Sequence, residues 1–220
     1  MELNDYVFGD AMELMKEIPD NSVDLVFTSM PDLSQTPYDK TPQGIADYQA
    51  FQAVAVTEIT RMVKPNGFVA ICQTDRRVNG GVLSNHMHYA KCLEQRGLKY
   101  KDHKIVVRNE VGKKDLYHFT FQHMMLFSQK GGFKRAGEFI KDIIVDKQMM
   151  VGNQSVWSQD FCKMVIEALT KEGEFVVDPF AGVGPVLYAA KSLNRQYWGA
   201  ELEEEFYNRD FEWFQNQLPV

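Results

Sequence analysis

The chain has 220 residues, of which 45% are hydrophobic and 12% aromatic, and its formal net charge is −6. This composition supports one substantial hydrophobic core and excludes a disordered, collagen-like or disulfide-framework protein. The longest apolar runs have the length of strands, so we expect no membrane span. The first ten residues lack the basic and apolar regions of a secretion signal, and we expect a cytoplasmic protein with a single domain over residues 1–220.

The first third of the chain alternates strands with helices. We predict strands at 6–9, 23–28 and 68–72 and helices at 11–18 and 47–63, with Asp10 capping the first helix. The turn 64–67 leads from the second helix into the third strand. Residues 30–46 contain three prolines and show no periodicity, which predicts a long functional loop.

The middle of the chain predicts a helix at 82–96, ended by Gly97, and two antiparallel edge strands at 100–108 and 119–127 around a charged turn at 111–115. Residues 129–155 form a short basic insert with no clear periodicity. The last third returns to alternation, with helices at 161–169, 184–193 and 203–217 and strands at 174–177 and 196–200. We therefore predict an α/β fold with a doubly wound, mostly parallel sheet.

Charge is unevenly distributed. Residues 99–147 hold 11 Lys and Arg against 6 Asp and Glu, a local +5, whereas the remainder holds 13 against 24, or −11. An acidic body with a basic middle is typical of a protein that presents one face to a polyanion, and an ordinary solvated surface gives the same count. Three widely spaced cysteines, Cys72, Cys92 and Cys162, are expected to be reduced and buried.

A strand running into Asp178 and a glycine-spaced turn, Phe180-Ala181-Gly182-Val183-Gly184, is the sharpest chemical pattern. Such a turn lets a ligand approach the backbone at a helix N-terminus, and Glu201, after the next strand, can accept hydrogen bonds from a ribose. The G-x-G-x-x-G spacing of pyrophosphate sites is missing, and an acidic turn repels phosphate. S-adenosylmethionine, whose methionyl ammonium can face Asp178, fits better.

These segments resemble the amino-methyltransferases that modify DNA bases. Residues 178–184, Ala189-Ala190 and 194–202 are similar to that family's DPFAGSGTT … AA … LGR … IGIEL signature, and residues 9–29 resemble its GD … IPDNSVDLVFTSPPY segment. The catalytic segment precedes the cofactor turn, as in the circularly permuted β group. The resemblance implies the Rossmann-like methyltransferase sheet of seven strands, one of them reversed.

The same resemblance implies site residues. Asp178, Phe180, Ala181, Gly182 and Gly184 would line the methionyl and adenosyl groups, Glu201 would hold the ribose and Asp10 would lie near the adenine amine. Asp160 and Phe161 occupy a further cofactor segment of the family without its usual residues.

The catalytic tetrad departs from the family. Where it has Ser or Asp, Pro, Pro and an aromatic residue, this chain has Ser29-Met30-Pro31-Asp32, so the ring that stacks on a flipped base is an aspartate. Three hypotheses follow: an adenine-N6 or cytosine-N4 methyltransferase whose aromatic comes from elsewhere, such as Tyr38; a methyltransferase for an RNA base or ring nitrogen, with Asp32 as base; or a noncatalytic methyltransferase-like binding subunit.

Nucleic acid, DNA before RNA, is the expected partner. Arg76 and Arg77 are placed for phosphate contacts, and Lys134 and Arg135 lie in the insert 129–155, where the family has its target-recognition segment. That segment is short, which favours a homodimer, a helper subunit or an RNA target read by shape. The five histidines, among them His86, His88 and His123, lack an HExxH or cysteine partner, so no metal is expected.

Overall fold

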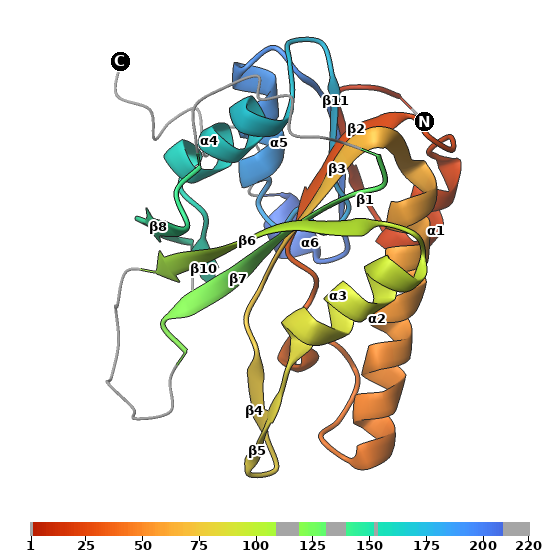
Figure 1. The fold of residues 1–220 in the computed structure, drawn as a ribbon, viewed down its shortest axis with the longest axis vertical. Coiled ribbons are helices and arrows are strands. Elements are labelled where there is room, and N and C mark those ends of the chain that lie inside the picture. Colours follow the sequence, from red (N-terminus) through yellow and green to blue (C-terminus); the bar gives the residue numbers. More distant parts are fainter. Residues whose placement is uncertain (1, 109–118, 131–139, 152–153, 209–220) are drawn as a thin grey trace.

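The structure is a computed structural model that describes residues 2–108, 119–130, 140–151 and 154–208 (Figure 1). Its centre is an eight-stranded sheet in the order β1-β12-β11-β2-β3-β7-β6-β8. The strands are β1 (Asp5–Phe8), β2 (Val23–Thr28), β3 (Val63–Gln73), β6 (Lys99–Arg108), β7 (Phe121–Ser128), β8 (Ile143–Asp146), β11 (Phe175–Asp178) and β12 (Gln196–Glu201).

Helices cover both faces of this sheet. α2 (Pro42–Met62) and α3 (Asn85–Gln95) lie on one face, with the short α1 (Ala11–Leu14), whereas α4 (Gln159–Leu169) and α5 (Pro185–Ser192) lie on the other (Figure 1). In β2, Leu25 and Phe27 join the hydrophobic cluster beneath α4 and α5, and Val26 joins the cluster beneath α2 and α3. Because β2 is buried on both faces, residues 25–27 are all apolar. The predicted doubly wound α/β fold is confirmed.

The edge of the sheet differs from the prediction. β7 is antiparallel to β3 and β6 and is the one reversed strand among the eight, but β6 and β7 are internal because β8 pairs with β6 in parallel. β8 comes from the insert that the sequence left unassigned. Its side chains alternate, with Ile144 buried and Ile143 and Val145 exposed, because only one side of an edge strand faces a core.

α2 begins at Pro42, five residues before the predicted start. The Oγ1 of Thr41 accepts a hydrogen bond from the backbone N–H of Gly44 at 3.1 Å, and Pro42 occupies the first helical position. Both are standard helix-start signals, since proline lacks the N–H that the first turn leaves unpaired. The predicted loop 30–46 therefore ends at residue 41 and contains the 3₁₀ turn η2 (Leu33–Gln35).

α3 begins three residues later than predicted because residues 81–83 belong to a β-hairpin. β4 (Arg76–Val78) and β5 (Gly81–Leu83) pair around Asn79 and Gly80, which have φ of 51° and 80°. An Asn-Gly pair is the strongest sequence signal for such a two-residue turn. The hairpin projects from the body of the molecule at the bottom of Figure 1.

A carboxylate fastens three neighbouring strands at the end of the sheet opposite the glycine turn. Asp24 accepts hydrogen bonds from Lys64 Nζ at 2.7 Å and from the backbone N–H of Phe175 at 2.9 Å. Beside it β3 bulges, since Val63 pairs with Val23 and Phe68 with Leu25. A Cβ on Gly67 would lie 2.8 Å from the carbonyl oxygen of Asp24, so this close approach requires glycine.

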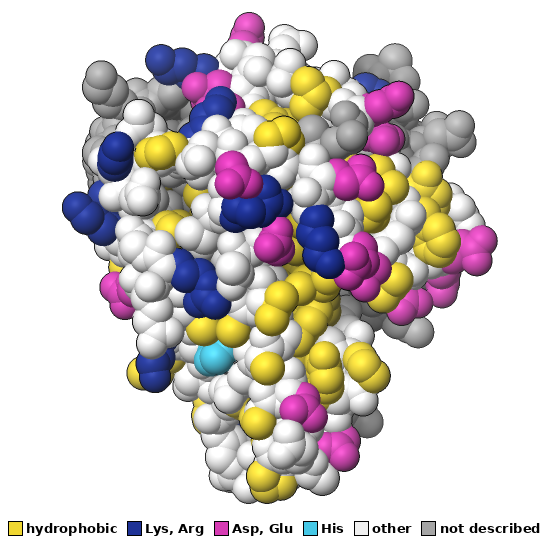
Figure 2. All heavy atoms as spheres, turned by 90° about the vertical axis from the view of Figure 1, so that its right-hand side faces the viewer, with side chains coloured by type: hydrophobic (Ala, Val, Ile, Leu, Met, Phe, Trp, Pro, Cys, Tyr) yellow, Lys and Arg dark blue, Asp and Glu magenta, His cyan; other side chains and the backbone are white. Residues whose placement is uncertain are grey.

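Other predictions are tested only in part. The three cysteines are buried, as predicted. The turn 111–115, the residues Lys134 and Arg135, and most of the predicted last helix lie outside the described residues, and α6 (Glu204–Tyr207) is the part of that helix within them. Among the described residues, no helix is long and apolar enough to cross a membrane. Figure 2 shows basic and acidic side chains interspersed over the face covered by α2 and α3.

Candidate active site

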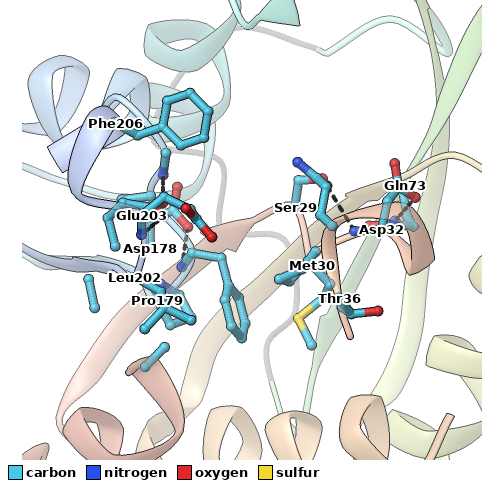
Figure 3. A pocket seen from close by; sticks show the side chains of 18 of the residues that line it. Ser29, Met30, Asp32, Thr36, Gln73, Asp178, Pro179, Leu202, Glu203 and Phe206 are labelled. Carbon is cyan, nitrogen blue, oxygen red and sulfur yellow. Dashed lines mark hydrogen bonds between the residues drawn. The ribbon is translucent and has the colours of Figure 1, made fainter. Parts of the chain in front are cut away.

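A cavity of about 660 Å³ brings the glycine turn and the loop after β2 together. β2 and β11 are adjacent and parallel, so the residues that follow them meet at one edge of the sheet, where ligands bind in open α/β folds. Figure 3 shows Asp178 and Glu203 on one side of this cavity and Ser29, Asp32 and Gln73 on the other. After the roles predicted from the sequence, we call these sides the cofactor half and the substrate half.

Backbone conformation shapes the cofactor half. Gly182 has φ of 57° and Gly184 has φ of 80°, a left-handed region that disfavours other residues. Gly184 is the N-cap of α5. A Cβ added to Gly182 would meet no atom within 4 Å, and this residue lines the cavity, so a ligand can approach the backbone here.

Glu201 holds the turn in place. Its Oε2 accepts a hydrogen bond from the backbone N–H of Gly182 at 2.8 Å, and its Oε1 accepts one from the N–H of Glu203 at 2.7 Å. Tyr6, on β1, donates its hydroxyl hydrogen to the carbonyl oxygen of Gly182. Burial raises the pKa of Glu201, and these backbone N–H groups oppose that rise. A carboxylate has about four acceptor positions, so Glu201 retains capacity for a ribose diol.

Asp178 is a buried carboxylate at the mouth of the turn. Burial raises its pKa to about 7, and the hydrogen bonds from Thr28 Oγ1 at 2.7 Å and the N–H of Phe180 at 3.2 Å oppose the rise. Both bonds are accepted by Oδ1. A buried carboxyl of this kind is costly to ionise without a cation, and an ammonium group would supply that cation.

Asp10 completes the acidic set of the cofactor half. Its Oδ1 accepts a hydrogen bond from the N–H of Met12 at 2.8 Å, which confirms the predicted cap of α1, and the residue lines the cavity. Asp10, Asp178, Glu201 and Glu203 all face this half. Four carboxylates and an open glycine backbone fit a ligand with a cationic end and a ribose, as S-adenosylmethionine has, and oppose a phosphate.

The substrate half begins at the end of β2. Ser29, Met30 and Pro31 line the cavity, and Met30 is 2% exposed, packed in the core beneath α2. The hydroxyl of Tyr48, on α2, donates a hydrogen bond to the carbonyl oxygen of Pro31 at 2.9 Å. Burial, with the nearby Asp32 carboxylate, raises the pKa of Tyr48 well above its usual range, so the phenol remains a donor. The loop is thus anchored within the tetrad, at Met30 and at Pro31.

The carboxylate of Asp32 is held by neighbouring side chains. Gln73 Nε2 donates a hydrogen bond to its Oδ1 at 3.2 Å, and Arg76 forms a salt bridge with its Oδ2. Its side chain and that of Gln35 also cap η2 reciprocally. Asp32 therefore ties residues 29–32 to β3 and to the hairpin.

Aromatic rings connect the two halves. The centroid of Phe51 lies 6.2 Å from that of Tyr38 and 6.3 Å from that of Phe180, and all three residues line the cavity. Tyr38 comes from the loop and Phe51 from α2. An apolar ring surface therefore lies beside the tetrad, although Asp32 itself provides none.

Most of the predicted site residues meet in this cavity. Its lining includes all four tetrad residues, Tyr38, Arg76 and six of the seven predicted cofactor residues; Gly184 shapes the turn without lining it. Arg77 is exposed, outside the cavity, with its guanidinium 5.2 Å from the ring centroid of Phe119. Phe161 is a core residue that packs edge-on against Trp157, and Asp160 is exposed, so neither lines the cavity.

Sequence reasoning missed the residues that reach the substrate half from distant elements. Gln73 ends β3, Arg108 ends β6, and Gln122, on β7, accepts a hydrogen bond from Trp157 Nε1 at 2.9 Å. No motif joins these positions, because strand pairing alone brings them together. Gln73 was detectable only as a polar residue at the end of a buried strand.

Comparison with known proteins identifies the family. The model of the DNA methylase family of N6/N4 methyltransferases matches residues 23–212. The chain belongs to this family. Membership confirms the predicted class of enzyme, an S-adenosylmethionine-dependent DNA methyltransferase. Among curated proteins, the type II methyltransferase M.BglII of Bacillus subtilis is 24% identical over 93% of this chain. The chain spans about two thirds of the length of that relative, 67%.

Solved structures share the fold. The PvuII DNA methyltransferase, which is cytosine-N4-specific, superposes with a TM-score of 0.80 at 14% identity, over 93% of this chain and 83% of its own. M1.HpyAVI, in complex with S-adenosylmethionine, superposes with a TM-score of 0.69 at 18% identity, over 94% of this chain and 97% of its own. The methyltransferase sheet predicted from the sequence is therefore confirmed, with β8 added at its edge.

Proposed function

We propose that this chain transfers a methyl group from S-adenosylmethionine to the N6 amine of adenine or the N4 amine of cytosine in DNA. The observation that carries the proposal is the single cavity in which an acidic glycine turn faces Ser29 and Met30. M1.HpyAVI binds S-adenosylmethionine on the same fold, and PvuII methyltransferase is specific for cytosine N4. When bound, the cofactor supplies a methyl group on a positively charged sulfur.

In this proposal, the cofactor half binds S-adenosylmethionine and the substrate half positions the amine of the base. Asp178 would pair with the methionyl ammonium, Glu201 with the ribose and Asp10 with the adenine amine. The Oγ of Ser29 and the carbonyl oxygen of Met30 would accept the two hydrogens of an exocyclic amine and so aim its lone pair at the methyl group. Positioning of this kind accounts for a large share of catalysis in group transfer.

The amine nitrogen must also lose a proton after the new N–C bond forms. Asp32 is the one carboxylate in the tetrad, but its two oxygens already bind Gln73 and Arg76. We therefore propose that Asp32 holds the loop against the hairpin, and that the amine loses its proton to water. Catalysis by Asp32 as base is the alternative, and it requires that the salt bridge open.

Stacking on the base would come from the loop rather than from the tetrad. Tyr38 lies next to Phe51 and beside Asp32's loop, where a flipped base would enter. Stacking on an aromatic ring contributes about 1–3 kcal/mol per base and tolerates any base. Tyr38 can therefore replace the aromatic residue that the family has in the tetrad.

Recognition of the DNA sequence is the least developed part of the chain. Segment 129–155 carries Lys134 and Arg135 and is the proposed recognition segment, but Ile140 and Ile144 from it pack in the core. Little of it is left for reading base pairs, since a single reading module buries about 600–1,000 Å². We propose that a second copy or a helper subunit supplies the remainder, which sedimentation with and without DNA would test.

The decisive experiment is transfer of labelled methyl from S-adenosylmethionine to separate pools of DNA and total RNA. We expect label in DNA, recovered as N6-methyladenine or N4-methylcytosine after hydrolysis. Ser29→Ala should abolish most of it, and Ser192→Ala, an exposed serine on α5, is the matched control. Asp32→Ala should slow methyl transfer, because it releases the loop that positions the amine.

Other outcomes separate the alternatives. Label in RNA alone, or on a ring nitrogen and lost in Asp32→Ala, would support a different acceptor with Asp32 as base. No label in either pool, with cofactor binding retained, would replace our proposal with a noncatalytic binding subunit.

A further inference from the structure

Three side chains outside the cavity form a compact cluster of metal-ligand types. His86 Nδ1 lies 2.8 Å from Asp75 Oδ1, and His123 Nε2 lies 3.8 Å from Asp75 Oδ2. One ligand atom from each residue falls within 4.8 Å of the other two. The rings of His86 and His123 are stacked with centroids 3.8 Å apart. Both therefore present a nitrogen to the same carboxylate.

The cluster is built from three elements that are distant in the sequence. Asp75 follows β3, His86 lies in the first turn of α3, and His123 lies on β7, paired with Gln73. The side chains of Asp75, His86 and His123 are 7%, 22% and 12% exposed. The carboxylate is thus shielded from water, while the histidines leave a route for an ion.

The donor set suits a divalent first-row transition metal. Two imidazoles and a carboxylate are common ligands of Zn²⁺, which takes nitrogen and oxygen at about 2.0–2.2 Å. Two atoms on one such ion lie up to about 4.3 Å apart. Closing the cluster on an ion therefore needs shifts of a few tenths of an ångström, well within side-chain motion.

A third histidine lies where an outer hydrogen-bonding partner of a metal ligand would lie. His103, on β6, has its Nε2 2.9 Å from His123 Nδ1. Ligating histidines usually hydrogen-bond through the nitrogen that does not bind the metal, and this bond fixes the ring.

We propose that Asp75, His86 and His123 bind a divalent transition-metal ion, with Zn²⁺ as the representative, and that His103 orients His123. Asp75 connects β3 to the hairpin, between Thr74 and Arg76, which both line the cavity. The ion would join the end of β3 to α3 and β7 and so fix the wall that carries Arg76. Asp75, His86 and His123 lie outside the cavity, so the proposal does not rest on the proposed function.

The test is binding of Zn²⁺ to the untagged full chain after treatment with a chelator. Calorimetry should give one ion per chain, and the ion should raise the Tm. Asp75→Asn and His123→Gln should each abolish both effects. Asn at position 75 retains an oxygen that can accept the backbone N–H of His86, now 3.2 Å from Asp75 Oδ1, so the start of α3 keeps its contact.

Two further variants sharpen the result. His103→Gln should weaken Zn²⁺ binding by about 10–100-fold, as loss of an outer partner does. His88→Gln removes a histidine two residues from His86 on the same helix, whose Nε2 contacts the carbonyl of Gln49, and should leave binding unchanged. Absence of binding at millimolar Zn²⁺, or binding that survives in Asp75→Asn and His123→Gln, would overturn the proposal and leave a metal-free hydrogen-bonded cluster.

Discussion

The two halves of the cavity are built in different ways. The cofactor half comes mostly from one continuous stretch, β11, the glycine turn, α5 and β12, and its shape depends on backbone conformation. The substrate half collects side chains from the β2 loop, β3, the hairpin, β6 and β7. A ligand common to a family can be served by local backbone geometry, whereas an individual acceptor depends on side chains that the fold assembles from afar.

The halves also differ in charge. Asp10, Asp178, Glu201 and Glu203 line the cofactor half, and the guanidinium groups of Arg76 and Arg108 line the substrate half with Asp32. Burial lowers the pKa of Arg108. A cationic cofactor and an anionic polynucleotide would each meet the opposite sign, so the cavity itself orients its two ligands.

The largest effect should come from filling the cofactor turn. Gly182→Trp places a ring in the open space of the cavity and should abolish binding of S-adenosylmethionine, measured by calorimetry. Gly173→Trp is the matched control, because Gly173 also has positive φ, 77°, and an open Cβ direction but lies in an exposed turn. Both variants carry about 1–2 kcal/mol of backbone strain. Equal loss of binding in both would mean that strain, not the site, is responsible.

The next effect concerns Asp178, whose pKa of about 7 makes cofactor binding depend on pH. The free carboxyl must ionise to pair with an ammonium, so affinity should fall about tenfold per pH unit below 7 and level off above it. Asp178→Asn should lower affinity at pH 8 by about ten- to 150-fold, since bonds to charged groups contribute about 1.5–3 kcal/mol, and should flatten the profile. A profile unchanged in Asp178→Asn would remove Asp178 from the site.

The contribution of Asp178 to folding stability should fall as pH rises, whereas its contribution to cofactor affinity should rise. Because the pKa of Asp178 is higher in the folded chain than its ordinary 3.8, its contribution to folding is present below about pH 4 and is lost as pH rises through about 7. An amide at this position does not ionise, so Asp178→Asn should not lose stability in this way as pH rises. We therefore expect the Tm of the variant, relative to the original chain, to be higher at pH 8 than at pH 5.

Stacking by the loop should have a smaller effect. Tyr38→Ala should weaken DNA binding or raise KM by about five- to 150-fold, which corresponds to the 1–3 kcal/mol of one stacked base. Tyr38→Phe retains the ring and should restore nearly all of it. If Phe is as damaging as Ala, the hydroxyl rather than the ring contributes.

The smallest effects should separate two neighbouring arginines. Arg76→Gln breaks the salt bridge to Asp32 and should lower kcat by about tenfold without changing cofactor affinity, because a misplaced loop misplaces the amine. Arg77→Gln, one residue away and outside the cavity, should leave kcat unchanged and reduce the salt dependence of DNA binding by about one ion. Steady-state kinetics at two salt concentrations distinguish the two.

The same contrast explains what sequence could predict. The cofactor half was predictable almost residue by residue, since residues 175–201 hold strand, turn, helix and acid in order. The hairpin was within reach, because Asn79-Gly80 is a recognisable turn. The salt bridge of Asp32 was not predictable, since it joins a loop to a strand 44 residues later. β8 was hidden because its three apolar residues and one aspartate suit an edge strand and a loop equally.

The order of strands has a consequence for how the chain acquires its structure. β1 lies at the edge of the sheet and pairs with β12, while β11 and β12 separate it from β2, its neighbour in the sequence. β1 therefore gains its partner only after β12, the last strand among the described residues, has been synthesised. Pairings between distant segments are slow, so this sheet should close late in folding. The glycine turn depends on the same closure, since Tyr6 of β1 and Glu201 of β12 both hydrogen-bond to Gly182.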